Sequence, residues 1–143
     1  MVHALREACR VLKGDGLLID LRPAPVHRHV GISENGTYVK VGVMREFLSD
    51  DRSANGAVAE MINSRRLRLK MRTRFECIRT MDQLSDFKAR LDELVQLGKG
   101  SSHDWLLRRM KETLTSKASA QTSRRRKIFM RGPMDLRVLI KTE

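Results

Sequence analysis

The run of residues 17–21, LLIDL, is the feature that most constrains the fold. Its side chains are apolar at every position except Asp20, and an uninterrupted apolar strand needs cover on both of its faces. Such strands are typical of the interior of parallel or mixed sheets, so we expect residues 17–21 to be the most buried strand of the chain. Pro23 and Pro25 end it, because proline has no backbone N–H for a sheet ladder. The chain is therefore expected to be an α/β protein.

A helix is predicted directly before this strand. Apolar residues recur at helical spacing over residues 2–12, and Gly14 and Gly16 then form a turn. We expect Gly16 to need a positive φ angle, so that valine at this position would unfold the protein. The inner stripe of the helix consists of Val2, Leu5, Cys9 and Leu12.

Two alternating runs joined by Asn35-Gly36 predict a β-hairpin over residues 26–43. A helix should follow from Ser49 or Asp50 to about residue 64, with one of these two residues as its cap. Asp50 and Asp51 could form a carboxylate pair, but capping explains them without a further assumption. A helical pair is predicted over residues 82–115 because apolar stripes follow two cap-like spacings, and residues 116–123 then read as a loop. The cap-like residues are Thr80 with Gln83 and Ser101 with Asp104.

Two long strands are predicted from an alternation of period two. Residues 66–78 place apolar side chains on one face and basic side chains on the other, and residues 124–140 do the same through Gly132-Pro133. We expect the first of these strands to have one wet, basic face. In chain order the predicted elements are helix, strand, hairpin, helix, strand, helix, helix and strand, with about four or five strands in a mixed sheet and helices packed on it. Residues 1–143 are expected to form a single domain.

The basic side chains of the two long strands would crowd one face if the strands pair antiparallel. Like charges opposite each other destabilise a sheet unless an anion lies nearby. Three explanations stay open, in this order: solvated arginines with Glu76 and Asp135 between them, contact with phosphates of nucleic acid, or contact with an acidic protein. The candidate residues are Arg66, Arg68, Lys70, Arg72, Arg74, Arg125, Lys127 and Arg131.

The segment of residues 5–22 resembles one part of the class I S-adenosylmethionine-dependent methyltransferases. In that family a helix ends in Arg-Val-Leu-Lys, turns on Pro-Gly-Gly and enters the fifth strand, as residues 10–20 do here in the form RVLKGDGLLID. Gly14 stands at the proline position and Asp15 at the first glycine, which Asp tolerates because it adopts positive φ in turns. Only this segment carries a motif, and the remainder follows the family by element order, with the hairpin 26–43 and the helical pair as insertions.

The resemblance implies the carboxyl-terminal half of a truncated Rossmann-like fold, in which the fifth strand lies between the fourth and the last. The family holds S-adenosylmethionine with a glycine-rich turn after its first strand and an acidic residue after its second. This sequence contains no such turn followed by a helix. We therefore expect no cofactor bound by this chain alone, no catalytic residues of its own, and a start at Met1 in what would be the family's fourth crossover helix. The sequence does not identify the methyl-accepting substrate.

Asp20 and Arg22 are the candidates for a substrate rim, because they leave the carboxyl end of the first strand. A plain ion pair between them is the favoured interpretation. His27 and His29 share one face of a predicted strand, but His103 is far along the chain and no third ligand has suitable spacing. No metal site is therefore expected.

Charge and cysteine content suggest the setting. The chain has 29 Lys and Arg against 17 Asp and Glu, a net charge of +12 that attracts phosphate-rich partners. Cys9 and Cys77 are expected on apolar faces as small hydrophobes, which favours a cytoplasmic location. No apolar run approaches the ~20 residues of a membrane span.

The expected partners follow from what the family fold lacks here. Strand 17–21 would have an open edge where the fourth strand is missing, and the stripe of helix 2–12 would be uncovered. A homodimer, or a missing amino-terminal half, is expected to pair there unless the hairpin seals the edge.

Overall fold

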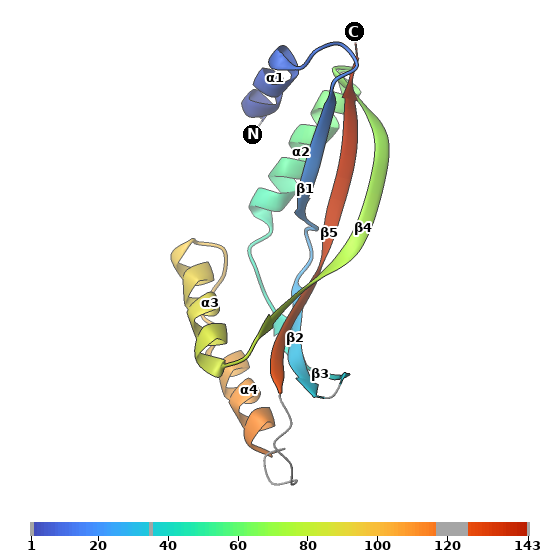
Figure 1. Ribbon diagram of the computed structural model, residues 1–143. Coiled ribbons are helices and arrows are strands. Elements are labelled where there is room, and N and C mark those ends of the chain that lie inside the picture. The colour runs from blue at the N-terminus through green and yellow to red at the C-terminus, as the bar shows by residue number, and fades with distance from the viewer. Residues whose placement is uncertain (1, 35, 117–125, 143) are drawn as a thin grey trace. The chain divides into compact units, whose positions relative to one another are not determined.

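The computed structural model describes residues 2–34, 36–116 and 126–142. Its elements follow the predicted order, which confirms the mixed α and β composition (Figure 1). Most of the predicted loop 116–123 lies outside the described residues. The helices are α1 (Val2–Val11), α2 (Ser49–Asn63), α3 (Leu84–Gln96) and α4 (Asp104–Ser116), and the strands are β1 (Leu17–Pro23), β2 (Arg28–Glu34), β3 (Thr37–Met44), β4 (Leu67–Met81) and β5 (Lys127–Lys141).

The elements group into two compact units, and β4 and β5 contribute to both. The first unit consists of Met1–Val26, Leu48–Glu76 and Pro133–Glu143, and the second of His27–Phe47 and Cys77–Gly132. The single domain over residues 1–143 that the sequence predicts stays a prediction.

In the first unit β1 pairs with β5 along its whole length. The pairing is antiparallel, from Leu17 opposite Ile140 to Pro23 opposite Met134. β4 pairs with β5 as well. Among the described residues β1 has no second strand neighbour, and the hairpin pairs with β5 instead of sealing the β1 edge. The predicted open edge is therefore present, but every register that the structure defines is antiparallel, so the expected interior position in a parallel or mixed sheet is wrong.

The helices α1 and α2 cover one face of this part of the sheet (Figure 1). Cys9 of α1 packs with Val58 and Met61 of α2 around the buried Leu139 of β5. Arg6 of α1 also forms an ion pair with Glu60 of α2 at 3.0 Å. The expectation of an uncovered α1 stripe is wrong for Leu5 and Cys9, because α2 provides the cover; the side chain of Val2 lies outside the described residues.

The prediction that β1 is the most buried strand is wrong. Leu17, Ile19 and Leu21 are 48%, 69% and 53% exposed, because the two helices cover only the face that carries Leu18. An apolar run signals cover on both faces only when the fold supplies two layers, and this unit supplies one.

The long strand β4 is confirmed and extends to Met81, but its two faces are alike in exposure. Only Leu67 and Met81 at its ends are buried. The expected contrast between a wet basic face and a buried apolar face is therefore wrong. Cys77 is exposed, so it is not a core hydrophobe, whereas Cys9 is buried as predicted.

The second unit contains the hairpin, α3 and α4. β2 pairs with β3 from Arg28 opposite Met44 to Glu34 opposite Thr37, which confirms the hairpin; Asn35 of its turn lies outside the described residues. β2 also pairs with residues 127–131 of β5. The core of this unit joins the hairpin to both helices of the predicted pair through Val30, Ile32, Met44, Phe87, Leu91, Leu94, Leu106, Met110 and Ile128.

The predicted caps of α2 and α3 are wrong, although the helices form where the apolar stripes place them. α2 begins after Leu48 and α3 after Gln83, and neither cap side chain bonds the helix. Thr80 lies within β4, because the strand continues to Met81 before α3 starts. Asp50 and Asp51 lie in the first turn of α2, where the positive end of the helix dipole favours carboxylates.

The turn before β1 places its positive φ at Asp15, with φ of 59°, and not at Gly16. A Cβ at Gly16 would lie 2.8 Å from the Lys13 carbonyl oxygen and 3.1 Å from Leu12. Gly16→Val should therefore destabilise the protein by about 2 kcal/mol through this backbone clash. Thermal unfolding measures the effect, with Gly14→Val as the control, because a Cβ at Gly14 meets no atom within 4 Å. Equal melting temperatures for the two variants would contradict this geometry of the turn.

Candidate functional site

Asp20 and Arg22 form an ion pair on the helix-covered face of β1. Arg22 Nε lies 2.6 Å from Asp20 Oδ1, and Arg22 Nη2 donates to Asp20 Oδ2 at 2.6 Å. This confirms the favoured interpretation of the pair. Because β1 continues to Pro23, Asp20 lies in the middle of the strand, and both side chains are largely buried. Their role in a substrate rim stays a prediction.

The pair extends across the sheet through the register of β1 and β5. Asp20 lies opposite Arg137, and Arg22 lies opposite Asp135. Arg137 reaches Asp20 at 3.9 Å and Asp135 at 3.8 Å, and it donates to Asn55 Oδ1 of α2 at 2.6 Å. Acidic and basic residues therefore alternate across the two strands, which is the favourable arrangement for cross-strand charges.

From β4, two of the predicted basic residues join the same cluster. Arg74 binds Asp135 in a fork, with Nε 2.7 Å from Oδ1 and Nη2 3.0 Å from Oδ2. Arg72 Nη2 donates to Asp135 Oδ2 at 3.3 Å. We refer to the resulting set as the arginine–aspartate cluster; it consists of Asp20, Arg22, Arg72, Arg74, Asp135 and Arg137.

The pKa directions in this cluster come from hydrogen bonding at Asp135 and from burial at Arg137. The bond from Arg74 lowers the pKa of Asp135, although burial opposes the shift. Burial lowers the pKa of Arg137, and the charge of Arg22 adds to the effect. Four guanidinium groups meet two carboxylates, so the cluster carries two excess positive charges. Arranged in this way, the groups hold three strands and α2 together.

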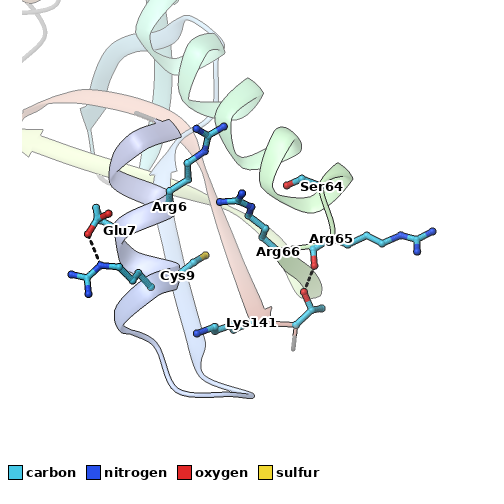
Figure 2. A pocket seen from close by; sticks show the side chains of 9 residues that line it. Arg6, Glu7, Cys9, Ser64, Arg65, Arg66 and Lys141 are labelled. Atoms are coloured by element: carbon cyan, nitrogen blue, oxygen red, sulfur yellow. Dashed lines mark hydrogen bonds and ion pairs between the residues drawn. The ribbon is translucent and has the colours of Figure 1, made fainter.

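A basic cavity of about 720 Å³ lies elsewhere in the first unit, between α1, the α2–β4 turn and the end of β5. Figure 2 shows the side chains of Arg6 and Arg66 lying near each other at this cavity. Arg10 pairs with Glu7 and Lys141 donates to the Leu12 carbonyl oxygen, whereas the described residues offer no ion-pair partner to Arg65 or Arg66. The lining residues are Arg6, Glu7, Cys9, Arg10, Ser64, Arg65, Arg66, Lys141 and Thr142.

Seven of the eight predicted basic residues are described, and they have different local surroundings. Arg66 lines the cavity, Arg72 and Arg74 bind Asp135, and Arg68 and Lys70 are exposed on β4. Lys127 and Arg131 belong to the second unit. There Lys127 lies 3.5 Å from Asp82, and Arg131 lies over the Tyr38 ring at 5.9 Å. Arg125 lies outside the described residues.

Two histidines, His27 and His103, have structural partners in the second unit. His27 Nδ1 accepts the backbone N–H of Glu46 at 3.2 Å, and the buried His103 has its Nε2 2.9 Å from the Arg45 carbonyl oxygen. In the described part of the chain, no group of three or more His, Cys, Asp or Glu side chains is placed to hold a metal ion.

Several residues of the arginine–aspartate cluster and of the basic cavity were not identified as site residues from the sequence. Asp135 was expected only as a carboxylate between the strand arginines, and Arg137, Arg6, Arg65 and Lys141 were not proposed. The alternation of β5 places Asp135 and Arg137 on one face, which is a detectable signal. The cavity brings together segments from both ends of the chain and from its middle, and no local pattern reveals that.

No family model, curated protein or solved structure matches this chain. Within the described ranges, none of the helices is both long enough and apolar enough to span a bilayer.

Proposed function

We propose that this chain is the carboxyl-terminal half of a class I S-adenosylmethionine-dependent methyltransferase fold, without catalytic activity of its own. The observation that carries the proposal is the pairing of β1 with β5. The strand that follows the Arg-Val-Leu-Lys segment lies antiparallel to the last strand over its whole length. That is the neighbour which the resemblance implies for the fifth strand of the family. The order of α2, β4 and β5 after β1 supports the same proposal.

The residues of this chain do not fit S-adenosylmethionine. Its glycine turn at Gly14 and Gly16 leads from α1 into β1, whereas a cofactor turn leads from a strand into a helix whose amino end faces the ligand. Asp20 is engaged by Arg22 and is not free to bind ribose hydroxyls. The proposal therefore includes no cofactor site on this chain.

Two measurements test the proposal. Calorimetric titration of the chain with S-adenosylmethionine should give no binding heat, and saturable binding would contradict the absence of a cofactor site. The coding region upstream of residue 1 should contain, in frame, a strand followed by a glycine-rich turn and a helix. A region that lacks this motif would contradict assignment to a methyltransferase.

The basic cavity favours a second candidate function, a nonenzymatic module that binds RNA through its phosphates. Arg65 and Arg66 line the 720 Å³ cavity without an ion-pair partner among the described residues, although only the Arg66 side chain lies toward Arg6, while that of Arg65 extends away from α1 (Figure 2). The chain has few aromatic residues on which bases could stack, so binding would be insensitive to base sequence. Contacts of this kind weaken steeply as salt rises.

The expected result for this second function is retention of a labelled RNA in a gel at ~200 mM salt. Replacing both arginines, as Arg65→Gln with Arg66→Gln, should lower the slope of log affinity against log salt by about 2, because each phosphate contact contributes about one unit. Arg108→Gln with Arg109→Gln is the matched control, since it removes the same charge from the exposed surface of α4. Equal slopes for the two double variants would exclude the cavity as the RNA site.

A further inference from the structure

The uncovered face of the first unit is an apolar surface that spans two strands at least. In β1 and β5, alternate residues point away from α1 and α2, and the register places them opposite each other: Ile19 faces Val138, and Leu21 faces Leu136. No member of this set is charged. We call it the open face; its β1 and β5 members are Leu17, Ile19, Leu21, Pro23, Met134, Leu136, Val138 and Ile140.

β4 extends the open face by alternation. Arg72 and Arg74 both bind Asp135 on the helix-covered face. Thr73 lies between these two arginines and Phe75 follows Arg74, so local alternation places both on the opposite side. This alternation does not extend to the start of β4, because Leu67 packs with Val58 and Met61 on the helix-covered face. Phe75 is exposed, so the open face includes a large aromatic side chain from a third strand.

The members of the open face are contiguous, unlike single exposed hydrophobic residues. Leu17, Ile19, Leu21 and Phe75 are 44–69% exposed and the other members are partly exposed. The open face therefore presents roughly 500 Å² of apolar area, comparable to the largest patch on a typical monomer, which is often functional. Two such faces in contact would bury about 1,000 Å², the lower limit of total area for a biological interface.

We infer that a second copy of this chain packs on the open face, sheet against sheet about a two-fold axis. Such an interface must match itself, and an uncharged apolar face does so without any pairing of opposite charges. The chain carries a net charge of +12, so two copies repel each other least where they meet through a surface without charge. Sheets with apolar faces pack in this way in β-sandwiches, at a separation of about 10 Å.

This arrangement differs from pairing of two β1 edges. Edge pairing would extend the sheet through backbone hydrogen bonds and leave the open face in water. Phe75 lies on β4, and β5 lies between β4 and β1, so an edge-paired dimer would not bury it. The inference does not depend on the methyltransferase proposal, because it rests on the exposed side chains alone.

Sedimentation equilibrium at micromolar concentration tests the inference with three single-lysine variants. The unmodified chain should be a dimer. Ile19→Lys and Phe75→Lys should each raise the dissociation constant by roughly 100-fold, because a two-fold interface buries both copies of the new charge. Val11→Lys is the matched control, since Val11 at the end of α1 is 68% exposed and Ile19 is 69% exposed, and it should leave the dimer unchanged.

Three outcomes would overturn the inference. A monomer at all concentrations would show that no second copy occupies the open face. Aggregates without a defined stoichiometry would show that the open face does not form a specific two-fold interface. Loss of the dimer in Ile19→Lys but not in Phe75→Lys would show that the β1 edges pair instead. Circular dichroism of each variant verifies that it is folded, and both substituted positions are exposed, so folding should be retained.

Discussion

Asp135→Ala is expected to destabilise the protein by about 2–3 kcal/mol, less than the ~3–5 kcal/mol of a fully buried ion pair, because Arg72 and Arg74 are half exposed. Asp135 is 5% exposed by side chain and accepts hydrogen bonds from Arg72 and Arg74. When the carboxylate of Asp135 is removed, the largely buried Arg137 keeps only Asp20 as a nearby carboxylate, and Arg22 shares that carboxylate. Because total stabilities are typically about 5–15 kcal/mol, the variant should lose a substantial part of its free energy of unfolding.

Chemical denaturation measures this effect as a change in the midpoint. Glu112→Ala is the control, because it also removes one carboxylate but from an exposed position on α4, and it should change the stability by less than about 0.5 kcal/mol. A similar small change in Asp135→Ala would show that the arginine–aspartate cluster is not a structural element.

The same cluster predicts a dependence of stability on pH. The pKa of Asp135 is lowered from its ordinary 3.8 in the folded protein, because Arg74 donates to the ionised carboxylate. The unfolded chain therefore takes up the proton first as the pH falls, so the contribution of Asp135 is complete above its ordinary pKa and is lost below it. Stability measured against pH for the unmodified chain and Asp135→Asn should converge as the pH falls from 3.8 through the folded pKa. Parallel curves would contradict this origin of the acid sensitivity.

Gly31→Ala is expected to destabilise the second unit by about 3 kcal/mol. Gly31 lies where the register of the hairpin shifts, between Val30 and Gly31. A Cβ there would overlap the Val39 carbonyl oxygen and lie 2.8 Å from the Tyr38 ring. Neither can move freely, because Val39 pairs with Ile32 in the hairpin and Tyr38 packs on Phe129 with centroids 5.2 Å apart.

Thermal unfolding followed by tyrosine fluorescence measures this loss. Gly56→Ala is the matched control, because a Cβ at Gly56 meets no atom within 4 Å and alanine favours the helix over glycine. It should stabilise the protein by about 0.5–1 kcal/mol. If both substitutions stabilise the protein, the close approach at Gly31 is wrong.

Local patterns in the sequence were sufficient to predict the order of the elements. Periods of two and of 3.6 depend on neighbouring residues alone, so the hairpin, the two long strands and the apolar stripe of α2 could be identified directly. The same reasoning failed for the caps of α2 and α3. Thr80 resembles the start of a helix, but it lies within β4, which continues to Met81.

By itself the sequence also determined the pairing of Asp20 with Arg22, because residues two apart on a strand share a face. Only the tertiary structure decided which charges join them. The β1–β5 register places Asp135 and Arg137 beside this pair from more than a hundred residues away. Register depends on side chains that meet after folding, so no local pattern encodes it.

Burial was likewise decided by the tertiary structure. The sequence determined that residues 17–21 are apolar, but not which of their faces the chain would cover. α1 and α2 pack on the side of Leu18, and Ile19 on the other side is left exposed. Hydrophobic burial depends on the area that another layer removes from water, and the layers exist only once distant segments have come together.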